Sequence, residues 1–252
     1  MEAKTWSRGF RWYQVSVVRL MVFVAVVAVL WSAWLYHREH ADIERSWVSI
    51  HLRDLLDDDA VQRRGAAENL DQVEADDVAR VVSGLACAVG DPDWQVRRAA
   101  AHSLANVIQR CAANSKEKLI DEVDLAMRAL IPALDDTSTE VRIAAMRSVG
   151  RLGAICPSPR GGPGRSATTG VVMPQAKAAA AALLKAMRDP ATHVRVAAIR
   201  SLGFIGPSAG IDFGPIKEAA ENDPTLEVRN AANDALVTGW LEQLQNRDVL
   251  SR

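Results

Sequence analysis

The residue types that most often carry catalysis or bind metals are few in this chain of 252 residues, and they are scattered. The three cysteines lie far apart and form no C-x-x-C pair: Cys87, Cys111 and Cys156. This spacing excludes a zinc ribbon or a thioredoxin-like redox site. The five histidines also lie in separate segments, without a cysteine or serine partner in a recurring arrangement: His37, His40, His51, His102 and His193. We therefore expect no enzyme activity, no metal site and no cofactor.

Two short motifs could suggest ion or nucleotide binding, but neither has the required pattern. The run Asp57 to Asp59 lacks the alternating ligands and the glycine of a calcium loop, so a helix cap and turn is the simpler interpretation. Gly162 to Ser166 superficially resembles a phosphate loop, but it lacks the Gly-Lys-Ser/Thr sequence and the flanking strand and helix. The formal net charge of −1 also argues against nucleic acid as a partner.

One recurring pattern dominates the chain after residue 40. An Asp is followed by a short gap, by Val-Arg-x-Ala-Ala and then by Leu or Val. Four good copies and one degraded copy carry it, and alignment on the Val position selects Gln62, Val96, Val141, Val194 and Val228. The steps between successive copies are 34, 45, 53 and 34 residues, and periods of this size indicate a helical solenoid.

Each copy predicts a pair of helices. Three of the aspartates are followed by Pro, which favours a helix start because the carboxylate can accept backbone N–H groups and Pro needs no hydrogen bond in the first turn. Counted from Val, positions 0, 3, 4, 7 and 8 lie on one side of such a helix. An amphipathic run precedes each one, at residues 43–56, 76–89, 119–134, 174–187 and 215–221. We therefore predict an all-α fold, an α-solenoid of about five helix pairs.

The D-P-x-x-x-V-R-x-A-A-x-x-L-G signature resembles the short HEAT repeat, in particular the subtype first associated with phycobilisome bilin lyases. The resemblance covers residues 43 to 245 and implies a HEAT/armadillo-like superhelix. It also implies that the repeated Asp and Arg form a structural ladder between neighbouring helix pairs. The residues assigned to this ladder are Asp91, Arg97, Asp136, Arg142, Asp189, Arg195, Asp223 and Arg229.

Function in a repeat protein lies where the copies differ. Positions 2, 5 and 6 are expected to point away from the core, and in the third and fourth copies they become apolar with an arginine rim. The resulting candidate surface for a protein partner consists of Arg98, His102, Ile143, Met146, Arg147, Val196, Ile199 and Arg200. The alternative is that position 2 or 5 packs sideways on the adjacent repeat, and the 3.6-residue period does not distinguish the two.

The copies also differ in length. The longest step contains a loop insertion at residues 156–174, which is rich in Pro and Gly and is expected to be a surface loop used in recognition or a neutral insertion. A shorter polar extension is expected near residues 111–118.

The first residues of the chain predict a membrane anchor. Residues 20–36 carry no charge, and the uncharged run extends to residue 15 if Arg19 reaches the headgroups, which makes a span of 15–36 long enough for a bilayer. Trp12 and Tyr13 stand at one end, and Trp31, Trp34 and Tyr36 stand at the other, as in an aromatic belt. A cleaved signal peptide is disfavoured because Trp31 occupies a position that should be small, and a core helix would be shorter and one-sided.

We thus expect an N-terminal tail at 1–14, a transmembrane helix at 15–36 and a repeat domain at 37–252. The expected location is a bacterial inner membrane, and four basic residues before the span against three behind it weakly favour an inside N-terminus and outside repeats.

The combined prediction is a single-pass, membrane-anchored scaffold that binds a protein partner and has no catalytic activity. The segment at 37–56 is expected to continue from the membrane helix. The family resemblance suggests an alternative function, an accessory subunit of a bilin lyase-like or other chromophore-handling enzyme. The aromatic-poor body and the anchor argue against that alternative.

Overall fold

The computed structural model describes residues 6–73, 77–114, 119–155, 174–205 and 212–237. The predicted loop insertion at 156–174 lies outside these residues except for Pro174, and so does the start of the predicted tail, residues 1–5. The chain divides into two units, residues 1–49 and residues 50–252, which are described separately.

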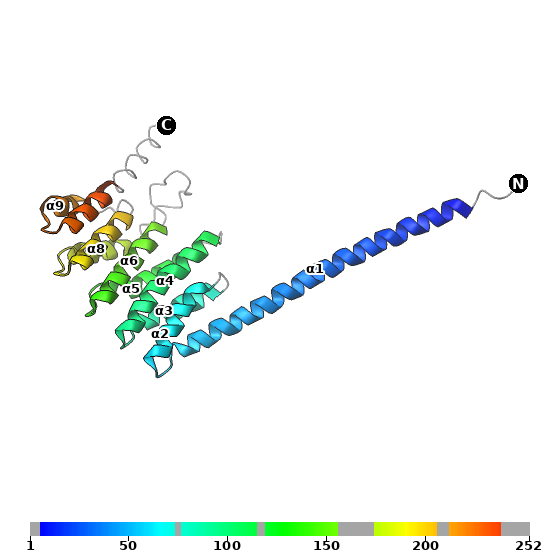
Figure 1. The fold of residues 1–252 in the computed structure, drawn as a ribbon, viewed down its shortest axis with the longest axis horizontal. Coiled ribbons are helices and arrows are strands. Elements are labelled where there is room, and N and C mark those ends of the chain that lie inside the picture. Colours follow the sequence, from blue (N-terminus) through cyan, green and yellow to red (C-terminus); the bar gives the residue numbers. More distant parts are fainter. Residues whose placement is uncertain (1–5, 74–76, 115–118, 156–173, 206–211, 238–252) are drawn as a thin grey trace, which may run out of the picture. The chain divides into compact units, whose positions relative to one another are not determined.

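The first unit is part of a single helix, α1, which runs from Trp6 to Asp54 over 49 residues (Figure 1). The helix therefore continues through the segment that the sequence suggested as an extension of the membrane span. Within α1, the stretch Arg19–Tyr36 is long and apolar enough to cross a membrane, and none of it is buried. Large side chains such as Phe23, Leu30 and Trp31 are more than half exposed there.

The second unit is helical throughout its described residues, and no strand occurs in them. After α1, its helices follow in chain order: α2 (Ala60–Asn69), the short 3₁₀ helix η1 (Leu70–Gln72), α3 (Val78–Ala88), α4 (Trp94–Asn114), α5 (Ile120–Ala133), α6 (Thr139–Ile155), α7 (Pro174–Ala186), α8 (Thr192–Ile205) and α9 (Gly214–Asn222). Residues 226–237 are also helical.

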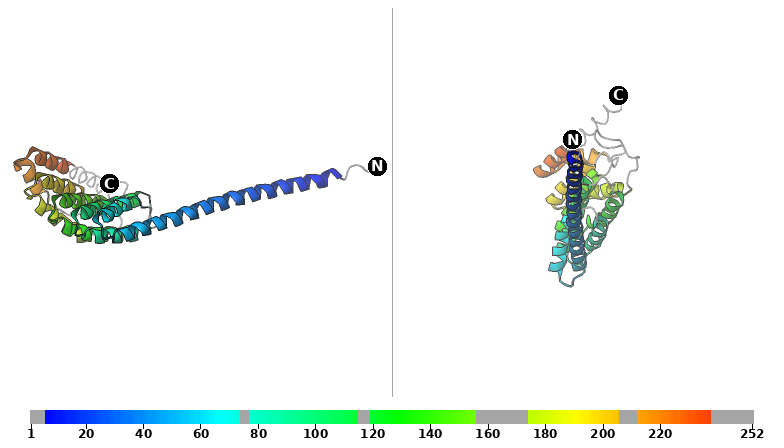
Figure 2. Two further views of the ribbon diagram at one scale, coloured as in Figure 1. Left: turned by 60° about the horizontal axis from the view of Figure 1, so that its bottom comes forward. Right: turned by 90° about the vertical axis from the view of Figure 1, so that its right-hand side faces the viewer.

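These helices form two layers that repeat along the chain, as Figures 1 and 2 show. In one layer α4 packs on α2 and α6, and α6 packs on α8. In the other layer α5 packs on α3 and α7, and each of these helices also contacts the helix that follows it in the chain. The fold is therefore an α-solenoid, as the sequence predicted. Each pair buries its apolar face against the next pair, which is how a repeat that is too small for its own core becomes stable.

The core between the layers consists of small and aliphatic side chains. The aligned Val of the four good copies is fully buried in each case, at Val96, Val141, Val194 and Val228, whereas Gln62 of the degraded copy is exposed. Large aromatic side chains are not among the buried core residues of the described segments. Neighbouring helices can therefore approach closely, because the contact is made by Ala, Val and Leu.

Two further repeated positions hold the layer of α4, α6 and α8 together. The buried Ser148 hydroxyl on α6 donates to the carbonyl oxygen of Ala101 on α4 at 2.6 Å. The equivalent Ser201 on α8 donates to the carbonyl oxygen of Met146 on α6 at 2.7 Å. Gly150 lies beside Ser201, and a Cβ added there would come within 3.0 Å of the Ser201 Cα. The glycine of the repeat signature thus permits the close contact in which the serine hydrogen bond forms.

Candidate functional site

Each repeat begins with an Asp whose side chain organises the turn before the helix. Asp91 Oδ1 accepts a hydrogen bond from the Asp93 N–H at 2.8 Å, and Asp136, Asp189 and Asp223 make the same contact with the residue two positions ahead. Helix α4 starts only at Trp94, so Pro92 lies in the turn and not at the first helical position that the sequence suggested. The reason is that the Asp carboxylate closes a turn, which moves the helix start two residues onward.

The repeated arginines connect successive units. Arg97 Nε donates to Asp136 Oδ2 at 2.7 Å, and its Nη2 donates to Asp136 Oδ1 at 2.9 Å. Its remaining nitrogen, Nη1, donates to the carbonyl oxygens of Asp91 and Pro92 at the start of its own unit. One guanidinium therefore joins the turn of its own repeat to the Asp of the next repeat.

The same arrangement recurs along the solenoid. Arg63 pairs with Asp91 and Arg195 pairs with Asp223, both through two nitrogens. The sequence assignment omitted Arg63, because its copy is degraded and lacks the Val. An Arg immediately after position zero was the signal that could have found it. Arg229, in the last described helix, donates to the Asp223 carbonyl oxygen at 2.6 Å.

Each Arg–Asp pair that joins two successive repeats is a rung of the ladder. The rung between Arg142 and Asp189 differs from the others. It has one contact, from Arg142 Nη2 to Asp189 Oδ2 at 3.2 Å. The Arg142 Nε is buried and has no hydrogen-bond partner among the residues that the structure describes. This rung is therefore the weakest of the four, and it joins the two copies between which the longest sequence insertion lies.

The rungs at Asp91, Asp136 and Asp223 lower the pKa of these carboxyl groups. The hydrogen bond from Arg97 is the main reason why the pKa of Asp136 lies below 3.8, and the Ser138 N–H adds to it. For Asp91 burial acts in the opposite direction, but the hydrogen bonds from Arg63 and from the Asp93 N–H still lower its pKa overall. The aspartates and arginines of the four rungs serve the fold, because each pair joins two successive repeats, whereas the contact of Arg229 with the Asp223 carbonyl oxygen lies within its own repeat.

The prediction of an apolar surface for a partner is wrong for the residues at its centre, because they are buried. Met146 and Ile199 are fully buried, and Val196 is only 5% exposed. In a solenoid each helix packs on the two neighbouring helices of its layer as well as on its own partner, so position 5 of the repeat faces the adjacent repeat. That is the sideways packing the sequence left open. Arg98, His102, Arg147 and Arg200 do lie at the surface, and Ile143 is half-buried.

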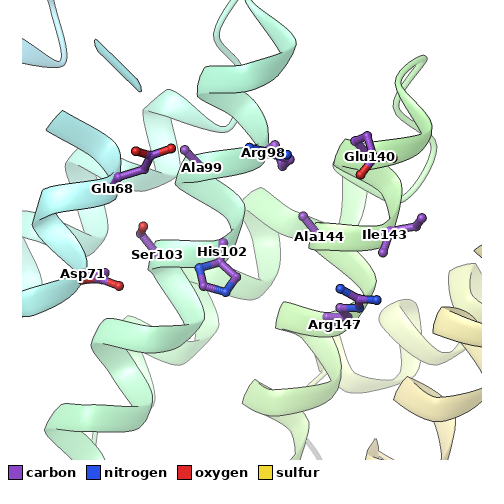
Figure 3. Close-up of a pocket in the computed structure, with 10 residues that line it drawn as sticks. All are labelled: Glu68, Asp71, Arg98, Ala99, His102, Ser103, Glu140, Ile143, Ala144 and Arg147. Atoms are coloured by element: carbon purple, nitrogen blue, oxygen red, sulfur yellow. The ribbon is translucent and has the colours of Figure 1, made fainter. Parts of the chain in front are cut away.

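The surface at these positions is hollowed into two grooves. The first groove, of about 320 Å³, lies between α4 and its neighbours α2, η1 and α6 (Figure 3). Its charged and titratable lining residues come from three places. These are Glu68 on α2 and Asp71 on η1, Arg98 and His102 on α4, and Glu140 and Arg147 on α6. Acidic and basic groups are therefore mixed in the first groove.

A hydrogen-bond network through Asn106 links Arg151 to two residues that line the first groove, Asp71 and His102. Arg151 Nη1 donates to Asn106 Oδ1 at 2.6 Å, which leaves the Asn106 amide NH₂ group to face Asp71 Oδ2 at 3.3 Å and His102 Nδ1 at 3.1 Å. Because the Asn106 amide donates in this contact, His102 Nδ1 must accept the hydrogen bond. A neutral imidazole therefore fits this hydrogen-bond network. Burial lowers the pKa of His102, and the positive charges of Arg151, Arg147 and Arg98 lower it further, against an opposing effect of Asp71.

The second groove, of about 180 Å³, lies between α6 and α8 and is also lined by Glu227 from the helix at residues 226–237. Arg147 and Arg151 line it from α6, and Arg200 lines it from α8. Its other lining residues are His193, Val196, Ala197, Ser201, Phe204 and Glu227. Three arginines thus face one carboxylate in a small groove, and Arg147 belongs to both grooves.

Metal ligands and thiols can be compared with the lining of the two grooves. Within the described segments, no group of three or more His, Cys, Asp or Glu side chains could hold a metal ion. Cys87 is exposed and Cys111 is buried, and neither lines a groove. The arrangement can bind charged groups at the surface. The sequence predicted Arg98, His102, Arg147 and Arg200 there, but it missed Arg151 and the acidic side chains of the first groove.

Comparison with known proteins agrees with this architecture. Residues 94–152, which contain α4 to most of α6, match the HEAT-like repeat family model. No curated protein sequence matches the chain. An engineered protein solved by the Northeast Structural Genomics Consortium has a TM-score of 0.55 and 20% identity, over 76% of this chain and 78% of that chain.

Two further solved structures are similar. The complex of CpcE and CpcF of phycocyanin lyase from Nostoc sp. PCC7120 has a TM-score of 0.54 and 21% identity, over 79% of this chain and 66% of that chain. A designed armadillo repeat protein in complex with the peptide (KR)4 has a TM-score of 0.53 and 18% identity, over 78% and 83% of the two chains. At these identities the likeness concerns the fold. The chain is thus similar to HEAT-like and armadillo-type repeat proteins, and the part at 94–152 matches the HEAT-like family itself.

Proposed function

We propose that this protein is a membrane-anchored scaffold that binds a partner protein through the first and second grooves and has no catalytic activity of its own. The main observation in support is that the arginines fall into two groups with different contacts. Those of the ladder are used in contacts between repeats, whereas Arg147 and Arg200 stand at the surface of two adjoining grooves. Arginine side chains that make no contacts between repeats are available to bind a partner protein.

The similar solved structures support a binding role. One of them is a complex of two proteins, CpcE and CpcF, and another is a designed repeat protein with a bound peptide. A groove that crosses several repeats suits an extended segment of a partner, because repeated helices present equivalent positions at regular intervals. A role as an accessory subunit of a bilin lyase-like enzyme is less well supported, because Phe204 is the one aromatic side chain that lines either groove within the described residues.

Membrane anchoring is the second part of the proposal. It rests on the exposed apolar stretch Arg19–Tyr36, whose 18 residues, at about 1.5 Å each, span roughly the thickness of a bilayer core. A solvent-exposed helix with this many large apolar side chains is unfavourable in water. An anchor of this kind would hold the grooves near a membrane and so restrict the partners that they meet.

Site-specific photo-crosslinking in native membranes tests the binding role. A photoreactive amino acid is placed at Ile143 in the first groove or at Phe204 in the second groove. Matched controls carry it at Lys177 on α7 or at Glu218 on α9, which are exposed and line neither groove. We expect one defined protein adduct from the groove positions and none from the controls. Equal crosslinking from both sets would contradict a role for the grooves.

A further inference from the structure

The second groove holds positive charge that the fold does not neutralise. Arg147 and Arg200 form no ion pair or hydrogen bond with any residue that the structure describes, and Arg151 donates only to the neutral Asn106. The ladder arginines contrast with them, since each rung from Arg63 to Arg195 reaches a carboxylate of the next repeat. Three arginines thus line a groove that one carboxylate, Glu227, also lines, and the excess of like charge costs electrostatic free energy.

The charge is also specific to these two repeats. The position six residues after the repeat Val is Glu68 in the first copy, His102 in the second, Arg147 in the third, Arg200 in the fourth and Asp234 in the last. Because α6 and α8 pack directly on each other, the two basic copies are adjacent. A local excess of positive charge on a surface favours a partner that carries negative charge there.

We propose that the second groove binds an acidic, extended segment of the partner protein, with carboxylate side chains on Arg147, Arg151 and Arg200. The inference deepens the proposed function and rests on it. Guanidinium groups match carboxylates in geometry as well as charge, since two N–H groups can donate to the two oxygens. Phe204, which is 56% exposed, provides apolar contact for the residues between the carboxylates.

The repeat geometry sets the spacing of the acidic residues. Axes of packed helices lie about 8–10 Å apart, and a segment in the extended polyproline II conformation advances about 3.1 Å per residue with about three residues per turn. Such a peptide therefore moves from Arg147 on α6 to Arg200 on α8 in about three residues, and side chains three positions apart lie on the same side of it. Carboxylates three positions apart fit the second groove best.

The first groove limits how far an acidic segment can extend. It shares Arg147 with the second groove, but Glu68, Asp71 and Glu140 line it as well. These carboxylates repel an acidic continuation, so the acidic part of the partner is held between α6 and α8. The mixed lining of the first groove thereby fixes the register of the bound segment.

Fluorescence anisotropy with labelled peptides tests the inference on the full chain in neutral detergent. The probe is a peptide of repeated Glu-Gly-Ser triplets, which places a carboxylate at every third residue, and the matched control peptide has Gln in place of Glu. We expect the Glu peptide to bind at least about tenfold more tightly than the Gln peptide and to weaken as salt rises from about 50 to about 200 mM.

Paired substitutions locate the site. Arg147→Gln with Arg200→Gln is expected to weaken binding of the Glu peptide at least about tenfold, whereas Arg110→Gln with Lys177→Gln, which removes the same charge from exposed sites elsewhere, is expected to change it less than about twofold. Circular dichroism and the urea midpoint show whether the variants are folded. Should the Gln pair unfold, Arg147→Lys with Arg200→Lys keeps the charge and loses the paired donors, and a clear weakening is again expected.

Three results would overturn the inference. The first is equal binding of the Glu and Gln peptides. The second is equal loss with the groove pair and with the control pair. The third is binding of inorganic phosphate or anionic phosphatidylglycerol vesicles that depends on Arg147 and Arg200 when the Glu peptide does not bind. If the photo-crosslinked partner is retained in the Arg147→Gln, Arg200→Gln variant, protein binding stands and the acidic segment alone is disproved.

Discussion

Arg97 on α4 and Asp136, which lie 39 residues apart in the sequence, are joined by two hydrogen bonds of 2.7 and 2.9 Å. The side chains are only 15% and 11% exposed, so the contact is shielded from solvent. This relationship shows how the solenoid sets the distance between repeats: the guanidinium has a fixed shape and reaches one carboxylate in one register.

Breaking this rung should destabilise the protein by more than breaking the weaker one. We expect Arg97→Gln to lower the free energy of unfolding by about 2 kcal/mol, because two charge-assisted hydrogen bonds are lost and Asp136 is left half-satisfied. Arg142→Gln should cost less, since Arg142 makes one contact of 3.2 Å to Asp189. Urea midpoints of the two variants measure the difference, and equal losses would show that the rungs are equivalent.

The same rung should make stability depend on acid. The pKa of Asp136 is lower in the folded chain than its usual 3.8, so the stabilisation is fully present above that value and is lost as the pH falls through the lower folded pKa. Asp136→Asn should therefore reduce the loss of stability between about pH 5 and about pH 3.

The neighbouring residue offers a matched control for that experiment. Asp135 pairs with Lys185 at 2.8 Å, but both side chains are mostly exposed. Asp135→Asn is expected to leave the acid dependence of the urea midpoint nearly unchanged, because exposed ion pairs contribute little. A similar effect of both substitutions would mean that the ladder is no more important than a surface pair.

Two glycines should respond to alanine in opposite directions. A Cβ at Gly65 on α2 would meet nothing within 4 Å, so Gly65→Ala should stabilise the helix by up to about 1 kcal/mol. A Cβ at Gly150 would lie 3.0 Å from the Cα of Ser201, which cannot move without shifting α8. Gly150→Ala should therefore destabilise the protein by about 1–3 kcal/mol. Thermal unfolding measures both, and stabilisation by both would contradict the close packing of α6 on α8.

Membrane anchoring predicts sensitivity to charge in the middle of the apolar stretch of α1. Ala25→Arg with Ala28→Arg should prevent insertion, because each Arg near the centre of a span costs about 2.5–3.5 kcal/mol. Carbonate extraction is expected to leave the unsubstituted chain, and the control Ala25→Leu with Ala28→Leu, in the membrane pellet. An unsubstituted chain that is released by carbonate would contradict the anchor.

Much of the architecture follows from local signals. The repeated Val, Ala and Leu positions predict the helices, and the periods of 34 to 53 residues predict their stacking, because such small pairs cannot bury their faces alone. The ends of the helices are less predictable: the Asp–Pro pair suggests a helix start, yet the Asx turn at Asp91 delays it to Trp94.

The sequence by itself determined an α-solenoid with a long apolar stretch near its N-terminus, since hydrophobic period and repeat spacing are local properties. Only the tertiary structure decided which repeated positions reach solvent. Met146 and Ile199 looked like surface residues on a single helix, but the neighbouring repeats cover them, and Arg147 and Arg200 remain outside. The physical reason is that a solenoid helix is covered from three sides, so its exposed face is set by the packing of the helices beside it and not by its own period.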